Sequence, residues 1–279
     1  MNQTIELKSN KSFDLDHSVF TSPNNVNTHI HDCYELFYYI SGDLTYYIEG
    51  HAYQLEPHDL IITNTRELHR VVFNSNSSYE RKYIHFKSDY LSAYQTEDYN
   101  LLNYIENRKL GHHNKIAAKD VLEQGIDQLW AKIEEAYLAE TPESAVLTKT
   151  YFIQMLIKIN EIFSKSNNKF AEKYKYDEKT IRLLDYLNHN LAKHISLDLL
   201  EEKFYANKYY LSHTFKRITG FTVMEYVTYK RIIWAMDLLV MDNPALDVAH
   251  TVGFNDYSTF YKAFKKITGT SPRKYLKRN

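Results

Sequence analysis

Residues 210–220, YLSHTFKRITG, and residues 259–269, TFYKAFKKITG, repeat one pattern 49 positions apart. Each copy has an aromatic residue or leucine, three further residues, a phenylalanine, two basic residues and then Ile-Thr-Gly. A period of this length indicates a repeated supersecondary unit. Each copy also follows a short helical pattern and a turn, so we predict two helix-turn-helix units, over residues 196–219 and 244–268.

The second helix of each unit is predicted to carry a polar face that points outward. Leu211 and Phe215 take the inward positions in the first unit, and Phe260 and Phe264 take them in the second. The N-terminal half of such an outward face is the part that enters a major groove of DNA, where hydroxyl, imidazole and lysine groups contact bases or phosphates. The predicted DNA-binding residues are Lys208, Tyr209, Ser212, His213, Lys216, Arg217, Tyr257, Ser258, Tyr261, Lys262 and Lys265.

Helix boundaries around the two units can be predicted from capping residues. Ser196 and Asp256 are expected to cap the helices that follow them, and Asn243 is expected to cap the first helix of the second unit. Gly220 is expected to end the first recognition helix. Residues 222–241 show a long helical periodicity, which we interpret as a rigid spacer between the units.

Charge is distributed unevenly along the chain. Residues 180–279 carry 15 Lys and Arg against 9 Asp and Glu, whereas residues 1–179 carry 19 against 26. The total net charge of −1 therefore hides a basic C-terminal part, which favours a polyanionic partner for that part alone. A chance imbalance of surface charge is the alternative explanation.

The composition is that of a globular chain with room for about two domains. The single cysteine, Cys33, excludes an internal disulfide and fits a reducing compartment, so a cytoplasmic location is expected. Residues 1–11 lack an apolar signal core, and no apolar run approaches the length needed to span a bilayer. No membrane association is expected.

The first half of the chain changes its pattern from strands to helices. Short strands separated by turns, from Thr28 to Phe86, predict a β-sandwich or small barrel. From about Lys119 the apolar periodicity becomes helical, with Thr141 as an expected N-cap, and a polar linker is predicted between residues 164 and 176. We therefore predict an effector-binding barrel over 1–118, a helical dimerisation or linker region over 119–170 and a DNA-binding domain over 171–279.

Three polar residues of one strand face the same way. His29, His31 and Glu35 share parity in an extended backbone, and His69 returns from a later strand. These four residues could hold a divalent transition metal, or they could line a ligand pocket or hydrogen-bond structurally. Nearby aromatic rings could stack on a sugar, although most are expected to be core residues. The predicted ligand-binding residues are His29, His31, Glu35, Tyr39, Tyr46 and His69, and no cofactor is expected.

Residues 177–279 resemble the DNA-binding domain of the AraC-type (AraC/XylS) transcriptional regulators. The resemblance rests on Gly253-Phe254, on Phe264-Lys265-Lys266 and on Ser271-Pro272-x-x-Tyr275. The first half resembles the cupin-like effector domain usual in that family, through the run His29-x-His31-x3-Glu35-x6-Gly42. Asp59 departs from the second cupin motif, which has glycine there, and Glu201 stands where the second unit has Ala249.

The resemblance implies a fold of two domains, a cupin-like β-barrel followed by helices and then an all-α tandem helix-turn-helix domain. It implies that the two units enter successive major-groove segments of double-stranded DNA and that the first half senses a small molecule. Carried over by position, the residues expected to contact bases are Tyr209, Ser212, His213, Tyr257, Tyr261 and Lys262.

We therefore expect a sequence-specific transcription regulator, an activator that responds to a small molecule such as a sugar. It is expected to act with RNA polymerase, as a homodimer, and not as an enzyme. One alternative is a metal-dependent cupin enzyme fused to a DNA-binding domain, with His29, His31, Glu35 and His69 as its ligands. Another is a regulator whose first half only dimerises.

Overall fold

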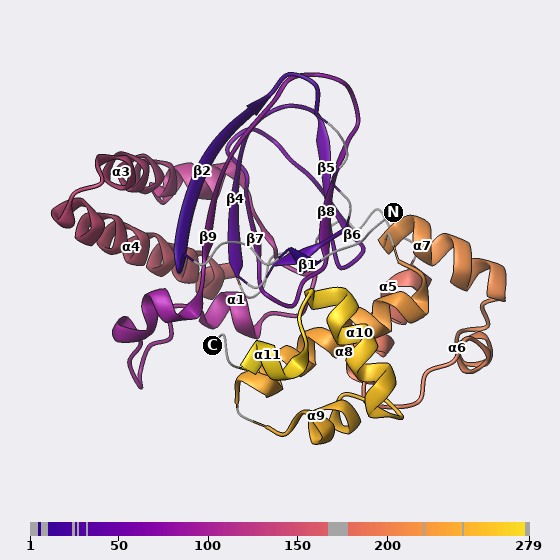
Figure 1. Ribbon diagram of the computed structural model, residues 1–279. Helices are drawn as coiled ribbons and strands as arrows, with labels where there is room; N and C mark the ends of the chain where they lie inside the picture. Colours follow the sequence, from indigo (N-terminus) through magenta and orange to yellow (C-terminus); the bar gives the residue numbers. More distant parts are fainter. Residues whose placement is uncertain are drawn as a thin grey trace.

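The computed structural model describes residues 5–6, 11–23, 26, 28–31, 33–166, 178–219, 221–241 and 243–276. A β-rich N-terminal domain lies between a pair of helices on one side and an all-α C-terminal domain on the other (Figure 1). This is the two-domain fold that the sequence predicts. Within the described residues, no helix is both long enough and apolar enough to cross a membrane.

The N-terminal domain consists of two facing antiparallel sheets. One has the strand order β10-β7-β4-β9-β2 and the other β6-β5-β8, while β1 pairs with β3 in a short parallel ladder. The strands are β1 (Ile5–Glu6), β2 (Phe13–Phe20), β3 (Ile30–His31), β4 (Tyr34–Ser41), β5 (Leu44–Ile48), β6 (His51–Gln54), β7 (Leu60–Thr63), β8 (His69–Phe73), β9 (Tyr79–Phe86) and β10 (Lys115–Ile116). Sequence alternation predicts β4 to β9 but misses β2, because most of its side chains are at least partly exposed and several are charged.

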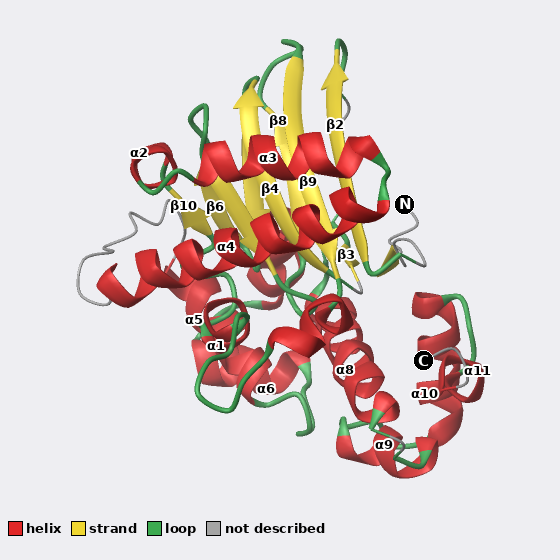
Figure 2. Cartoon of the chain, turned by 90° about the vertical axis from the view of Figure 1, so that its left-hand side faces the viewer, coloured by secondary structure: helices red, strands yellow, loops and turns green. Residues whose placement is uncertain are grey.

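Alternate residues of β4 face two different cores. Leu36 and Tyr38 point outward and belong to the buried cluster that contains Trp130 of α3 (Ile126–Ala139) and Phe152 of α4 (Pro142–Ser166). Figure 2 shows these two helices lying across that face of the sheet. Phe37 and Tyr39 point the other way, into the interior between the two sheets. The interior is therefore filled largely by aromatic side chains.

The helices of the first half begin and end close to the predicted positions. Gly125, with φ 67°, separates α2 (Ala118–Glu123) from α3, where the sequence predicts a continuous pattern. Thr141 caps α4 as predicted, because its Oγ1 accepts a hydrogen bond from the Ser144 backbone N–H. α4 continues to Ser166, so the first part of the predicted linker is helical; the rest of it, from 167 on, lies outside the described residues. The short helices η1 (Ser88–Tyr94) and α1 (Asn103–Asn107) complete this half.

The C-terminal domain contains both predicted helix-turn-helix units. Its helices are α5 (Glu178–His189), α6 (Leu197–Phe204), η2 (Tyr210–Thr214), α7 (Phe215–Thr219), α8 (Val223–Val240), α9 (Ala245–Thr251), α10 (Tyr257–Thr268) and α11 (Pro272–Leu276). Ser196 and Asp256 cap α6 and α10 as predicted, each through a backbone N–H three residues on. The prediction for Asn243 is wrong: its amide donates to the Leu238 carbonyl at the end of α8 instead. Gly220 lies outside the described residues.

The first recognition helix is not a continuous α-helix. η2 is a π-helical turn, in which the Phe215 N–H donates to the carbonyl of Tyr210, five residues earlier. The sequence predicts an α-helix through the same residues, and the second unit has one in α10. The two recognition helices therefore differ in backbone geometry despite their shared sequence pattern.

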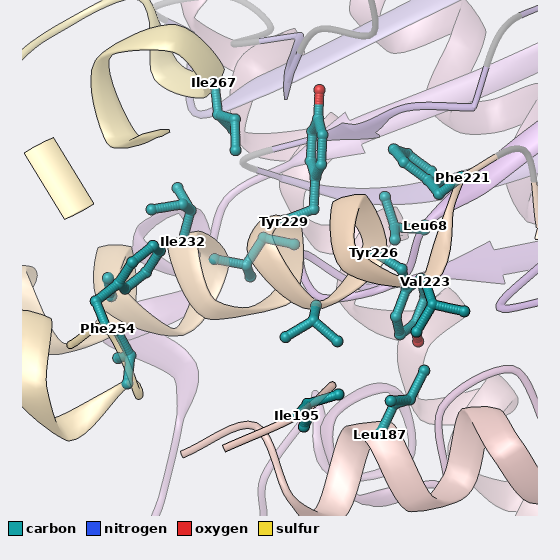
Figure 3. Close-up of a cluster of buried hydrophobic side chains, with 14 of the residues drawn as sticks. Leu68, Leu187, Ile195, Phe221, Val223, Tyr226, Tyr229, Ile232, Phe254 and Ile267 are labelled. Carbon is teal, nitrogen blue, oxygen red and sulfur yellow. The ribbon is translucent and has the colours of Figure 1, made fainter. Parts of the chain in front are cut away.

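α8 is the central element of the C-terminal domain and is buried on several sides. Its residues contact α9, α10 and α11, and Figure 3 shows Leu187, Phe254 and Ile267 among the side chains packed around it. Leu68 of the N-terminal domain lies in the same buried cluster, as does Ile30. A helix that is apolar on most sides belongs in a core, so α8 joins the two units to each other and to the β-rich domain.

Candidate functional sites

The recognition helices expose most of the residues predicted to contact DNA. In the first unit, Lys208, Tyr209, His213, Lys216 and Arg217 are exposed, and the rings of Tyr209 and His213 stack 4.5 Å apart. The outward edge of this helix is therefore not covered by the protein's own core. The Lys208 ammonium group pairs with Asp198 at 2.6 Å, and the Ser212 side chain lies outside the described residues.

The second unit presents a similar exposed face. Ser258, Tyr261, Lys262 and Lys265 are exposed on α10, whereas Tyr257 is half-buried against Phe260. Tyr257 was predicted to point outward, and its ring instead contributes to the edge of the domain core. The remaining four residues form a polar and basic surface suited to phosphates and base edges.

A buried carboxylate of the N-terminal domain holds α8. Glu49, at the turn between β5 and β6, is 2.6 Å from the Lys230 ammonium nitrogen through Oε1, and its Oε2 accepts a hydrogen bond from the Tyr226 hydroxyl. The Leu68 backbone N–H donates to Glu49 Oε1 at 2.7 Å, and Lys230 also donates to the Arg66 carbonyl at 2.6 Å. Burial and the adjacent Glu49 charge raise the pKa of Tyr226 well above its ordinary value, so the phenol stays a donor. We call Glu49, Tyr226 and Lys230 the interdomain latch.

Two further contacts join the domains at the end of the first recognition helix. Thr28 Oγ1 donates to the Thr219 carbonyl at 3.2 Å, and the Arg70 guanidinium group donates to the Arg217 carbonyl at 3.0 Å. The C-terminal end of α7 is thus fixed to the β-rich domain, while Tyr209 and His213, earlier in the recognition helix, remain exposed.

The predicted histidines meet inside the β-rich domain around one carboxylate. Glu35 Oε2 lies 3.0 Å from His31 Nε2, 3.5 Å from His69 Nε2 and 3.3 Å from His85 Nε2. The His29 ring centroid is 4.4 Å from that of His69. These five residues form what we call the histidine cluster, and all but His29 are buried.

Burial and mutual contact set the charge states within the histidine cluster. Burial alone would raise the pKa of Glu35, but the facing nitrogens of His31, His69 and His85 hold that pKa well below its ordinary range. Burial lowers the pKa of His31 to about 3, against the opposing effect of Glu35. At neutral pH the cluster thus combines an ionised carboxylate with a neutral His31 imidazole.

A rigid loop orients His69. Its Nδ1 lies 2.9 Å from the backbone carbonyl of Glu67. Two hydrogen bonds from Arg108 clamp the Glu67 carboxylate, which also accepts from the Gly111 N–H at 2.8 Å. Although burial opposes ionisation, Arg108 lowers the pKa of Glu67, so this buried ion pair persists at neutral pH.

The donor set of the histidine cluster suits a divalent transition metal. The ligand atoms of His29, His31 and His69 lie within 4.8 Å of one another, as do those of His31, Glu35 and His85. Neutral imidazoles with a carboxylate bind zinc, cobalt, nickel and related ions, and a histidine held by a backbone carbonyl is the usual way to orient such a ligand. A bound ion would supply positive charge and could polarise an oxygen ligand.

Tyr39 and Tyr46, predicted to contact a ligand, are buried side chains of the aromatic interior. The Tyr39 hydroxyl donates to the Gly42 carbonyl at 2.5 Å. The Tyr46 hydroxyl lies 3.5 Å from Glu35 Oε1, and its ring stacks on His69 at 5.9 Å. Both hydroxyl groups are thus engaged within the protein.

Sequence reasoning missed four residues of these sites: His85, Glu49, Tyr226 and Lys230. His85 is the cross-strand partner of Glu35 on β9, so its role depends on a register that only the folded sheet defines. Lys230 falls within the apolar periodicity of α8, and a lysine at such a position is a signal for a buried partner.

Two family models match the chain, each over the part that forms one of the domains. An AraC-like ligand binding domain matches residues 21–156, and a helix-turn-helix domain matches residues 200–278. The chain belongs to the AraC-type transcriptional regulators. In this AraC-type regulator the ligand-binding match contains the histidine cluster and Glu49, and the helix-turn-helix match contains both recognition helices and α8.

Several curated proteins are similar to parts of this AraC-type regulator. The lactose operon transcription activator of Staphylococcus xylosus is 25% identical over 178 residues, which cover 63% of this chain and 62% of that protein. The melibiose operon regulatory protein of Escherichia coli K12 is 32% identical over 97 residues, 34% of this chain and 32% of that protein. The bifunctional transcriptional activator/DNA repair enzyme AdaA of Bacillus subtilis is 31% identical over 94 residues, which cover 33% of this chain and 44% of that protein. The chain thus spans less than two thirds of the length of each.

Among solved structures, an apo ToxT variant from Vibrio cholerae aligns with 96% of this chain and 98% of its own, with 16% identity and a TM-score of 0.40. The C-terminal domain of the response regulator AraT from Geobacillus stearothermophilus aligns with 38% of this chain and 88% of its own, with 25% identity and a TM-score of 0.37.

Proposed function

We propose that this regulator binds a specific sequence of double-stranded DNA through both helix-turn-helix units and that an effector bound in the β-rich domain changes that binding. One observation carries the proposal. α8 connects two recognition helices with exposed polar faces, and the same helix is held by Glu49 of the effector domain. An effector that favours one position of Glu49 over another would alter how both units meet DNA.

The regulator is proposed to be a cytoplasmic activator that contacts RNA polymerase as a homodimer. The names of the lactose operon and AdaA relatives include the word activator, which supports that role. The exposed side chains of Leu138 on α3 and Val146 on α4 support a dimer surface, because 69% and 65% of their areas remain accessible.

A sugar is the effector class that the sequence favours, and the lactose and melibiose operon regulators support it by name. It would have to displace the internal hydrogen bonds of Tyr39 and Tyr46. The rival hypothesis, a metal-dependent enzyme fused to a DNA-binding domain, requires an open coordination position at the histidine cluster. We expect no catalytic turnover.

Selection from a random double-stranded library with the purified chain tests the DNA-binding part of the proposal. A single enriched sequence with two separate half-sites is expected, with an affinity that falls steeply with salt. His213→Ala and Lys262→Ala should each relax base preference in a different half-site, while Lys119→Ala, an exposed lysine on α2, serves as the matched control. Enrichment of no sequence, or of one unaffected by either substitution, would refute the proposal.

A further inference from the structure

The structure assigns a divalent transition metal ion to the histidine cluster, as the effector that controls the docking of the DNA-binding domain. This inference rests on the proposed function and puts a metal ion in place of the sugar as the effector. The site includes His85. The residues that flank His29 and His69 connect the site to the DNA-binding domain.

The hydrogen bond of His69 is the first evidence. A carbonyl oxygen can only accept, so the Nδ1 atom of His69, 2.9 Å from the Glu67 carbonyl, carries a proton. Nε2 is therefore the ring nitrogen left to bind a ligand, and it lies 3.5 Å from the Glu35 carboxylate. A cation placed between His69 Nε2 and the Glu35 carboxylate would be within reach of both.

The second evidence is a set of buried imidazole nitrogens gathered around the Glu35 carboxylate. Within the described residues, no hydrogen-bond partner reaches His31 Nδ1 or His85 Nδ1, while His69 Nε2 and His85 Nε2 face only the Glu35 carboxylate, at 3.5 and 3.3 Å. Buried polar atoms are nearly always paired, so imidazole nitrogens gathered around one carboxylate suit a positively charged ligand. Imidazole and carboxylate donors together select a transition metal ion over magnesium or calcium.

The geometry of the interior favours an ion over a sugar. The polar atoms near Glu35 are ring nitrogens and the Tyr46 hydroxyl, and the neighbouring inward positions are taken by packed aromatic rings such as Phe37, 5.0 Å from the Tyr46 ring. A single ion uses the nitrogens already directed at Glu35, whereas a sugar would need hydroxyl partners that are occupied.

The cluster is directly connected to the domain interface. His29 lies between Thr28, which donates to the Thr219 carbonyl, and Ile30, which packs in the core of the DNA-binding domain. His69 lies between Leu68, in the same core, and Arg70, which donates to the Arg217 carbonyl. The backbones of His29 and His69 also pair, with N–H to carbonyl distances of 2.9 and 3.0 Å. An ion that draws these two rings together would move the residues on which the first recognition helix is docked.

The test uses the full chain, stripped with a chelator and dialysed against zinc, cobalt or manganese chloride. We expect one zinc or cobalt ion per chain by elemental analysis, and a cobalt absorption spectrum typical of nitrogen and oxygen ligation. Glu35→Gln and His85→Ala should abolish stoichiometric binding, while His17→Ala, an exposed histidine on β2 paired with Glu80, should retain it. The cobalt spectrum of the unsubstituted chain needs no variant and remains informative if a substitution prevents folding.

DNA affinity provides the second measurement, on a sequence obtained by library selection. Loaded and stripped protein should differ in affinity at least about fivefold. Absence of a stoichiometric ion, or a bound ion that leaves DNA affinity unchanged, would overturn the inference, as would a sugar that shifts affinity in the stripped protein. In each of those cases sequence-selective binding persists, whereas failure of the proposed function would appear as no selective binding in either state.

Discussion

Replacement of Lys230 by methionine tests the interdomain latch. Lys230 and Glu49 are both buried, and their charged atoms are 2.6 Å apart. Loss of the ammonium group leaves the Glu49 carboxylate buried with only Tyr226 and the Leu68 N–H as donors. Removal of one member of a buried pair costs about 3–5 kcal/mol. That cost reduces the ratio of docked to undocked domains by a factor of about a hundred to several thousand.

Companion substitutions separate the charge from the packing. In Glu49→Gln the amide oxygen still accepts a hydrogen bond from Lys230, and the amide can still hydrogen-bond with Tyr226. The loss of unfolding free energy should therefore be smaller than in Lys230→Met, about 1.5–3 kcal/mol. The double variant carries no unpaired charge and should be more stable than Lys230→Met alone. Lys109→Ala is the matched control, because Lys109 forms an exposed interdomain pair with Asp185 and should contribute at most about 1 kcal/mol.

Tryptophan fluorescence during urea unfolding can report on each domain separately. The chain has two tryptophans, Trp130 on α3 of the effector domain and Trp234 on α8, and each can be replaced by phenylalanine to leave one reporter. In Lys230→Met the Trp234 transition should move to lower urea than the Trp130 transition. A destabilisation below about 1 kcal/mol, or a double variant as unstable as Lys230→Met, would refute the argument.

Three other predictions concern separate parts of the chain. Burial lowers the pKa of His112 to about 4, below its value of about 6.5 in an unfolded chain, so unfolding free energy should fall as pH drops from 6.5 to 4; His112→Gln should flatten that slope in urea titrations. His213→Ala and Lys262→Ala should each weaken DNA binding by about 1–3 kcal/mol in fluorescence anisotropy if they contact bases, and unchanged affinity in both would contradict the assignment. Gly253→Ala should cost about 1–3 kcal/mol or more in thermal unfolding, because φ is 97° and its Cβ would meet a carbonyl oxygen at 2.6 Å, whereas Gly269→Ala meets no atom within 4 Å and should cost less.

The parts of this fold that depend on local sequence were predictable. The repeat at 49 positions located both helix-turn-helix units, and the caps at Ser196 and Asp256 are confirmed because capping is decided within four residues. The prediction that His31 and Glu35 lie together is confirmed, since their side chains meet at 3.0 Å, but the single strand assumed for them is wrong: His31 ends β3 and Glu35 lies in β4, in a different sheet.

The remaining features depend on contacts between distant segments. His85 reaches Glu35 only because β9 pairs with β4 in one particular register, and a shift of one residue would turn it to the opposite face. Glu49 and Lys230 are 181 positions apart, and the sequence around either residue does not indicate that the other is its partner. Asn243 was assigned as a cap by its residue type, yet Pro244 is the N-cap residue of α9, and the Asn243 side chain instead donates to the Leu238 carbonyl.

The π-helical turn in η2 has a consequence for the DNA that this chain would recognise. One extra residue in a helical turn shifts side chains by about 100° around the axis, so the exposed residues of the two recognition helices are not arranged equivalently, although Leu211 and Phe215 keep the inward positions of Phe260 and Phe264. The two halves of the operator should therefore differ in sequence, and a genome search for tandem identical boxes would overlook it. The two helix-turn-helix units, although similar in sequence, would thus bind two different DNA sequences.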